Sequence, residues 1–345
     1  IFDKTKDIKF LSSKKQVNNI PLKKSIKVLH RKDKLNVEVW EPINNDIEKH
    51  LIIFMPGLGG DIGNFRWIGS ELSKRGWPVI FIDHQGSNSD TFKAVIKGIE
   101  AFPSGADNFL YRIKDLNAII NANKEGFFNL KNQSYILMGH SLGSLIAFLY
   151  EGYLPINGFE ERCDKALKDF AVTNLSKLLQ CQLTQIPIPE FDKSSDLKAL
   201  IGFNSFGSLI WPYPQKIGIK VPVLLIGGTY DLITPLLSEQ FKVFLSADSN
   251  LKNRFLVVEG ASHFSPIRVT SANSTIDSGA DVFNISENFI GSYPFDFQNL
   301  SLEIIVKFLN NLETKNGLNI FKKQNAYDLN FHILGTDQIR EIIKN

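Results

Sequence analysis

The stretch YILMGHSLGSLIAFLY, residues 135–150, joins an apolar run to a helical pattern through the segment Gly-His-Ser-Leu-Gly. The unbroken apolar run before this segment is typical of a strand buried on both faces of a sheet. A serine at such a strand-to-helix turn lies at a helix amino terminus, where free backbone N–H groups stabilise negative charge. This context favours Ser141 as a catalytic nucleophile over the alternative, a turn that serves packing alone.

The glycines of this segment support the same interpretation. Gly139 and Gly143 lie two residues before and two residues after Ser141. In a tight turn that presents a serine, side chains at these two positions would collide with neighbouring backbone. We therefore expect both glycines to be required by the turn around Ser141.

The rest of the chain repeats the alternation of strand and helix. Apolar runs predict buried strands at 50–57, 78–83, 134–139, 197–204, 221–228 and 254–260, the last strand, and helical patterns lie at 64–77, 107–123, 140–154 and 301–313, the closing helix. Strands that are apolar throughout and alternate with helices indicate a mainly parallel sheet covered on both faces. Residues 25–31 and 34–42 alternate apolar and polar side chains, which predicts an antiparallel hairpin before the sheet.

These patterns divide the chain into four expected parts. Residues 1–24 form an amino-terminal arm, and residues 25–150 together with 197–313 form an α/β core. Residues 151–196 interrupt the alternation and are predicted to be a helical cap, inserted over the carboxyl edge of the sheet, where such sheets place their sites. Residues 314–345 form a carboxyl-terminal extension to which the sequence assigns no structure.

Composition sets the broad class of the protein. The chain has 345 residues, of which 43% are hydrophobic and 22% are charged, as in ordinary soluble globular proteins. A net charge of +3 does not favour a nucleic-acid partner, and no apolar run reaches the ~18–20 residues that cross a membrane. Because the chain begins with Ile1, the protein is expected to be either cytoplasmic or exported with its leader removed. The sequence does not indicate an oligomeric state.

The two cysteines are interpreted as structural. Cys163 and Cys181 lie 18 residues apart and lack the spacing of a metal site. They predict either one disulfide in an exported protein or two buried thiols in a cytoplasmic one.

Several motifs together resemble the α/β-hydrolases of the dienelactone-hydrolase-like group, which includes platelet-activating-factor acetylhydrolases and cutinase-like polyester-cleaving enzymes. The resemblance covers roughly residues 35–310, and it is carried by GHSLG with the stretches at 56–90, 111–116 (YRIKDL), 227–235 (GGTYDLITP) and 260–265 (GASHFS). It implies the α/β-hydrolase fold. The chain departs from the group at Pro56, which replaces the usual His, and at Gln85, where Pro is common. Its nucleophile is Ser, where dienelactone hydrolases use Cys, so dienelactone is not carried over as substrate.

In this fold the acid and then the histidine base follow the nucleophile along the chain. Only His263 and His332 lie downstream, and His263 is favoured because it comes just after the strand predicted at 254–260. Asp231 closely follows the strand at 221–228, so we expect it to accept the Nδ1–H of His263 and to fix its tautomer. The alternative for Asp231 is a cap on the helix that starts near Thr234.

Two backbone groups are expected to stabilise the oxyanion. The glycine-rich segment MPGLGG, residues 55–60, ends the first buried strand. The N–H of Leu58 and the N–H of Leu142, one residue after the nucleophile, would form the oxyanion hole; the alternative is a flexible turn. His84 ends the strand at 78–83 and either lines the site or is a structural loop histidine, whereas His140 is expected to pack under the turn.

The sequence thus predicts a serine-dependent carboxylic ester hydrolase that works through an acyl-enzyme without a cofactor or a metal. The expected partner is a small-molecule ester, with lipid-like esters as the favoured class. A histidine base predicts that kcat/KM falls as the pH drops through roughly 6.5. Two alternatives remain open: a hydrolase fold reused as a ligand-binding or receptor module, and the same chemistry on an amide or thioester.

Overall fold

The computed structural model describes residues 20–43, 49–97, 105–130, 133–151, 154–168, 174–187, 195–247, 250–267, 294–314 and 317–344. Most of the arm expected at residues 1–24 lies outside these residues. The arm prediction is wrong at its end, because residues 22–24 already belong to the first strand, Leu22–Ile26.

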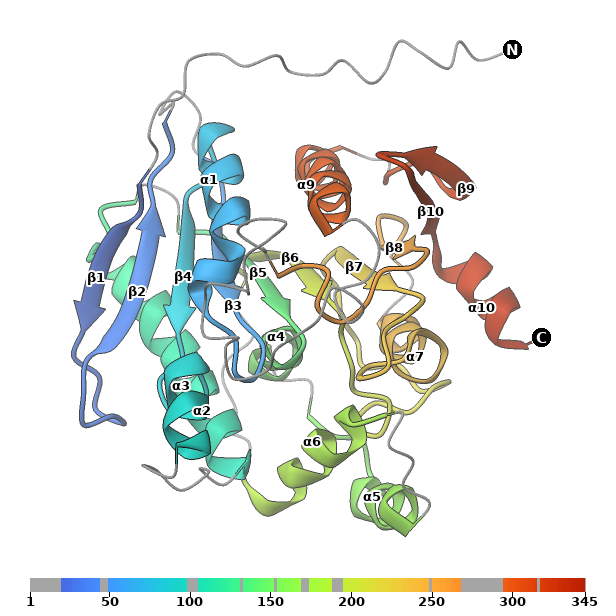
Figure 1. Cartoon of the computed structure of the whole chain (residues 1–345), viewed down its shortest axis with the longest axis horizontal. Helices are drawn as coiled ribbons and strands as arrows, with labels where there is room; N and C mark the ends of the chain where they lie inside the picture. The colour runs from blue at the N-terminus through green and yellow to red at the C-terminus, as the bar shows by residue number, and fades with distance from the viewer. Residues whose placement is uncertain are drawn as a thin grey trace.

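Among the described residues, ten strands form a central sheet in the order β1-β2-β4-β3-β5-β6-β7-β8-β10-β9 (Figure 1). Six neighbouring strands run parallel: β4, β3, β5, β6, β7 and β8. At one side of them β2 and β1 pair antiparallel, and at the other side β10 and β9 do so. The mainly parallel sheet and the amino-terminal antiparallel hairpin, β1 with β2, are confirmed. The strands are β1 (Leu22–Ile26), β2 (Leu35–Trp40), β3 (Leu51–Met55), β4 (Val79–Asp83), β5 (Tyr135–His140), β6 (Leu197–Phe203), β7 (Val223–Gly228), β8 (Arg254–Val258), β9 (Phe321–Ala326) and β10 (Leu329–Leu334).

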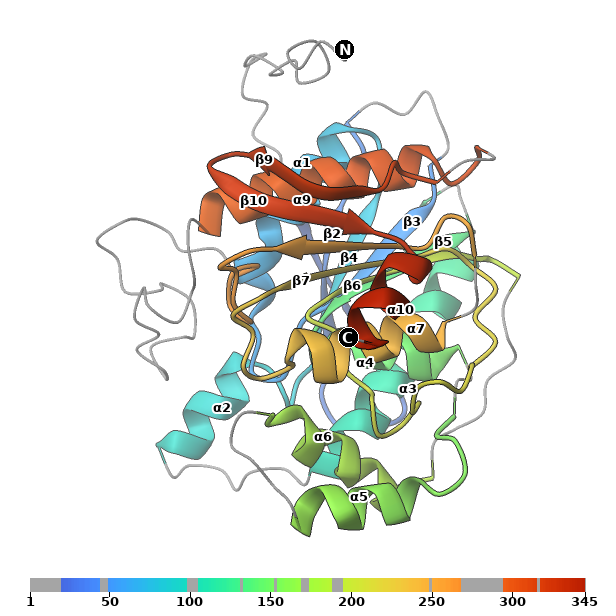
Figure 2. The same ribbon diagram turned by 90° about the vertical axis from the view of Figure 1, so that its right-hand side faces the viewer.

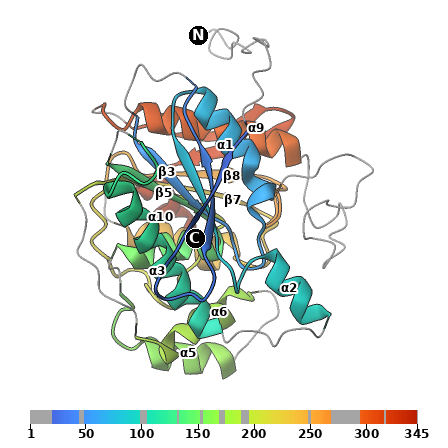
Figure 3. The same ribbon diagram turned by 90° about the vertical axis from the view of Figure 1, so that its left-hand side faces the viewer.

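Helices cover both faces of the sheet, as predicted (Figures 2 and 3). One apolar core packs α1 and α9 against the sheet, and a second packs α3, α4 and α7 against the opposite face. The helices are η1 (Ile62–Phe65), α1 (Arg66–Lys74), α2 (Ser89–Ile96), α3 (Gly105–Lys124), α4 (Leu142–Tyr150), α5 (Phe159–Lys168), α6 (Ser176–Gln182), η2 (Leu183–Gln185), the π-helix η3 (Leu236–Gln240), α7 (Phe241–Ser246), α9 (Pro294–Asn310) and α10 (Thr336–Lys344).

The middle strands of the sheet are buried on both faces, and this is why they could be predicted from apolar runs in the sequence. Every residue of β3, β5 and β7 is buried. Burial on both faces selects continuous apolar runs rather than alternation. The parallel strands end at the same edge, so the loops after β3, β5, β7 and β8 meet there.

The strand predicted at 254–260 is β8 and the helix predicted at 301–313 is part of α9, but the prediction that they are the last strand and the closing helix is wrong. The extension supplies β10, which pairs antiparallel with β8, then β9 at the edge and α10 at the end. In β10 the apolar Leu329, Phe331 and Ile333 are buried and alternate with less buried residues. In contrast, β9 has the polar sequence FKKQNA and is largely exposed, so it carries little apolar signal.

The segment expected to be a cap contains α5 and α6, which lie side by side outside the sheet (Figures 1 and 2). A disulfide between Cys163 of α5 and Cys181 of α6 joins them, with 5.4 Å between the Cα atoms. Of the two alternatives for these cysteines, the structure has the disulfide. Across the described ranges, no helix combines the length and apolarity needed to cross a membrane.

Candidate active site

Ser141 lies between β5 and α4 with an uncommon backbone conformation. Its φ is +51° and its ψ is −118°, a strained combination for a residue with a side chain. The Ser141 N–H donates to Phe203 O at 2.9 Å, which ties the turn to the neighbouring strand β6. Strain held by surrounding hydrogen bonds is common at functional sites.

The two glycines that flank Ser141 have no room for a side chain. A Cβ added to Gly143 would lie 1.9 Å from Met55 O, and one added to Gly139 would lie 2.4 Å from Gly143 C. Such distances would force the backbones of β3, β5 and α4 apart. This close approach of three backbones is the physical reason for glycine at both positions.

Asp231 and His263 are in direct contact. His263 Nδ1 lies 2.9 Å from Asp231 Oδ2 and 3.1 Å from Oδ1. Both side chains are buried. Asp231 follows β7 and His263 follows β8, and these strands are parallel neighbours. The carboxyl edge of the sheet therefore brings the two residues together.

The ring of His140 connects this pair to the Ser141 turn. His140 immediately precedes Ser141, and its ring centroid lies 4.9 Å from that of His263. His140 Nε2 donates to His263 O at 2.9 Å. Burial, and then the charge of His263, lower the pKa of His140 to about 3, so it stays neutral. These contacts match the predicted packing role of His140.

Asp231 also caps the turn that follows it. Its Oδ1 accepts the N–H groups of Ile233 at 3.0 Å and Thr234 at 2.8 Å. Burial alone would raise the pKa of Asp231, but His263 and Thr234 outweigh it through charge and hydrogen bonds, so this pKa lies below its usual value. The carboxylate therefore makes both contacts that the sequence offered as alternatives.

The ionised state of Asp231 determines which histidine tautomer is present. A carboxylate accepts hydrogen bonds and cannot donate, so His263 Nδ1 must carry the proton. In the neutral ring the Nε2 lone pair is then free to accept a proton. This arrangement has the geometry with which a histidine can accept a proton while a carboxylate orients its ring.

The loop after β3 lies against the Ser141 turn. A Cβ on Gly57 would lie 3.2 Å from Ser141 Cβ and 3.0 Å from His140 Nδ1. Within the described ranges the Leu58 N–H donates no hydrogen bond, whereas the Gly59 N–H donates to Ser87 O at 2.8 Å. Leu142 is the first residue of α4, and its N–H has no acceptor within the helix. Two N–H groups, one directly after Ser141 and one in the loop that lies against its turn, are therefore available to a ligand.

His84 belongs to a buried network that sequence reasoning missed. Its Nδ1 lies 2.8 Å from Asp115 Oδ2, and Asp115 also binds His30 at 2.7 Å and Arg31 at 2.6 Å. Arg31 donates in addition to Gln85 O at 2.7 Å. Burial and then nearby positive charge lower the pKa of His84 to about 4. These contacts favour the structural alternative for His84.

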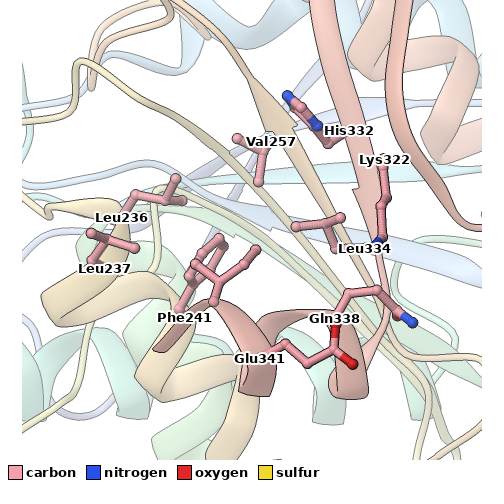
Figure 4. A pocket seen from close by; sticks show the side chains of 10 residues that line it. Leu236, Leu237, Phe241, Val257, Lys322, His332, Leu334, Gln338 and Glu341 are labelled. Atoms are coloured by element: carbon pink, nitrogen blue, oxygen red, sulfur yellow. The ribbon is translucent and has the colours of Figure 1, made fainter. Parts of the chain in front are cut away.

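The other candidate base, His332, lies elsewhere. It is part of β10, and its Nε2 lies 2.8 Å from Glu259 Oε1. It also lines a pocket of about 330 Å³ between α7 and the carboxyl-terminal extension (Figure 4). The pocket's remaining lining residues are Leu236, Leu237, Phe241, Val257, Lys322, Leu334, Gln338, Glu341 and Ile342. Ser141, Asp231 and His263 are not among them, so this pocket gives no measure of a substrate site beside Ser141.

Comparison with known proteins bears on the fold. Residues 50–166 match the family described as alpha/beta hydrolase fold. No curated protein matches the chain. Among solved structures, the chain is similar to an alpha-beta serine hydrolase homologue from Coxiella burnetii, with 17% identity and a TM-score of 0.39 over 70% of this chain and 89% of that one.

The family match and the helix-covered parallel sheet define the class: the chain has the α/β-hydrolase fold. The match does not extend to the dienelactone-hydrolase-like group. A fold of this kind carries many reactions, so the reaction must be argued from the site.

Proposed function

We propose that the protein is a serine hydrolase that cleaves carboxylic esters through an acyl-enzyme. Ser141 is the nucleophile, His263 the general base and acid, and Asp231 the orienting acid. The observation that carries the proposal is the buried contact of 2.9 Å between His263 Nδ1 and Asp231 Oδ2, joined to the strained Ser141 turn by the His140 ring, which lies 4.9 Å from that of His263. The resemblance to the dienelactone-hydrolase-like group supports the same roles.

In the proposed first half-reaction, Ser141 Oγ attacks the ester carbonyl carbon while His263 Nε2 takes the hydroxyl proton. Negative charge develops on the carbonyl oxygen, and the N–H groups of Leu58 and Leu142 stabilise it. The C–O bond then breaks, the alcohol leaves with the proton from His263, and the acyl group stays on Ser141. Asp231 stabilises the imidazolium that forms during this step.

The second half-reaction releases the acid. His263 Nε2 removes a proton from water, and the resulting hydroxide attacks the acyl carbon. The same N–H groups stabilise the oxyanion, and Ser141 Oγ leaves with the proton. The proton that Ser141 lost to the alcohol is thus replaced by one from water, so both residues regain their starting protonation states and the cycle uses only the ester and water.

Kinetics with nitrophenyl esters of increasing chain length test the proposal and also report the acyl preference. We expect turnover by the natural sequence and a loss of ~10⁴-fold or more in kcat for Ser141→Ala. Ser144→Ala is the matched control, since Ser144 lies one turn further along α4, where its Oγ is 2.5 Å from Ser205 Oγ. Equal activity of Ser141→Ala and the natural sequence would contradict the proposal.

A non-catalytic binding module is the second candidate, and the same assay separates it. Such a module predicts no turnover of any ester by the natural sequence. If the protein instead cleaves matched amides or thioesters with the same dependence on Ser141, the proposed residue roles stand and only the substrate class changes.

A further inference from the structure

The side chain of Arg112, on α3, lies directly behind the loop that carries Leu58. Arg112 is 1% exposed. Its Nη1 donates to Pro56 O at 2.6 Å and its Nη2 donates to Gly57 O at 2.9 Å. It also binds Ser87, through Nε to Oγ at 2.8 Å and Nη2 to O at 3.2 Å. One guanidinium therefore joins the loop after β3 to the loop after β4.

The buried cation Arg112 makes these contacts, although neutral donors could also hold the loops after β3 and β4 together. All four acceptors are hydroxyl or carbonyl oxygens, and the carboxylate of Asp115, one turn further along α3, already receives two hydrogen bonds from Arg31. Burying a charge without a directly bonded counter-charge is costly. The cost suggests that the charge itself has a role at this position.

The peptide group between Gly57 and Leu58 links Arg112 to the site. Gly57 O and the Leu58 N–H belong to this one group, and the peptide is trans. In a trans peptide the C=O and N–H point in opposite directions. With its oxygen held by the guanidinium, the group directs the Leu58 N–H away from Arg112. A charged donor on the oxygen also polarises the peptide, which strengthens the N–H as a donor.

We infer that Arg112 is a positioning residue that orients and polarises the Gly57–Leu58 peptide, so that the Leu58 N–H becomes a strong donor to the oxyanion. The inference rests on the proposed function, because it needs an oxyanion beside Ser141. Arg112 does not touch the substrate. Its effect grows with the negative charge on the carbonyl oxygen, so it stabilises the transition state more than the bound ester.

The test compares Arg112→Gln and Arg112→Lys with the natural sequence. A nitrophenyl ester reports kcat and KM, with active enzyme counted by fluorophosphonate titration. A trifluoromethyl ketone, which forms a tetrahedral adduct with a catalytic serine, reports affinity for the oxyanion. We expect kcat to fall on the order of 10- to 100-fold in Arg112→Gln, with KM changed less than ~3-fold. Ketone affinity should fall by a similar factor, and Arg112→Lys, which keeps the charge, should lose less.

Arg254→Gln is the matched control. Arg254 is also buried and donates to three backbone oxygens, those of Leu318, Leu251 and Asn253, but it starts β8 at the opposite edge of the sheet from His263. We expect this variant to be less stable, with kcat per active enzyme and ketone affinity unchanged.

The outcomes separate the inference from the proposed function. If the natural sequence turns over no ester, both fail. If it is active but Arg112→Gln keeps kcat and ketone affinity, only the inference fails. Should Arg112→Gln not fold, Arg112→Lys decides: parallel losses in kcat and ketone affinity support the inference, and unchanged values per active enzyme overturn it.

Discussion

Asp231 shows how one carboxylate holds both a histidine ring and a loop. One oxygen accepts the Ile233 and Thr234 N–H groups, and His263 Nδ1 is within hydrogen-bond distance of both oxygens. Three further donors converge on Oδ2: Asn204 Nδ2 at 2.7 Å, Thr234 Oγ1 at 2.6 Å and Gln240 Nε2 at 3.1 Å. Removing the charge and removing the oxygens should therefore have different consequences.

Asp231→Asn should separate the two roles. The new amide keeps one oxygen for the capped turn, and it can be accommodated because neither Asn204 Oδ1 nor Gln240 Oε1 has a partner in the described part of the chain. Facing an NH₂ group, the His263 ring is driven to the tautomer protonated on Nε2, which cannot act as base. We expect kcat to fall ~10³- to 10⁴-fold, while thermal unfolding shows a smaller loss of stability than in a variant that removes both oxygens.

Asp231→Ala is the comparison, since it loses the cap as well and should also lower the free energy of unfolding by ~1–2 kcal/mol. If Asp231→Asn keeps kcat within tenfold of the natural sequence, Asp231 is only a cap.

At the scale of elements, the π-helix η3 connects α6 to the loop between β7 and η3, which carries Asp231. Its Glu239 is fully buried and accepts hydrogen bonds from Asn174 Nδ2 at 2.9 Å, Gln180 Nε2 at 3.1 Å and Ser208 Oγ at 2.8 Å. The first residue of α6 is also bonded to this loop, because the Ser176 N–H donates to Ile233 O at 3.2 Å. Glu239 thus fixes α6 beside the loop that carries Asp231.

Glu239→Gln should weaken this connection, because an NH₂ group would face the donors that now point at a carboxylate. We expect the free energy of unfolding to fall by ~1–3 kcal/mol, and KM to rise more than kcat falls. Urea unfolding and ester kinetics measure the two effects. Glu71→Gln on α1, which removes partly exposed pairs with Lys74 and Arg75, should cost about 1 kcal/mol or less. Equal effects of the two variants would rule out a special role for Glu239.

At the scale of the whole molecule, two buried histidines make stability depend on pH. Burial lowers the pKa of His84 to about 4 and that of His140 to about 3, whereas an unfolded histidine titrates near ~6.5. Between these values the unfolded chain binds more protons than the folded one. The stability that both groups contribute is therefore complete above pH ~6.5 and is lost as the pH falls toward 4.

The variant His84→Asn with His140→Gln should flatten this dependence, because each amide nitrogen can take over the hydrogen bond that the ring makes. We expect urea unfolding at pH 7, 6 and 5 to show a steep loss of stability in the natural sequence and a shallower one in the variant. Equal slopes would show that these histidines do not control the acid sensitivity.

The sequence predicted those parts of the fold and site whose signal lies within one segment. The buried strands are apolar runs in the sequence, and Asp231 and His263 each follow such a strand. Because these strands are parallel, the two residues are expected to lie together at the carboxyl ends of the strands. The roles of Arg112 and Glu239 depend on neighbours distant in sequence, and no local pattern shows which oxygens surround a buried charge. β9 was missed because it is a polar edge strand.

The most direct test of the central claim, that Ser141 is the nucleophile, is the mapping of a fluorophosphonate adduct by mass spectrometry of the digested protein. The account predicts one phosphonyl group per chain, on the peptide that contains Ser141, and slower labelling when His263 is replaced by alanine. An unlabelled protein, or an adduct on another residue with Ser141 unmodified, would contradict it.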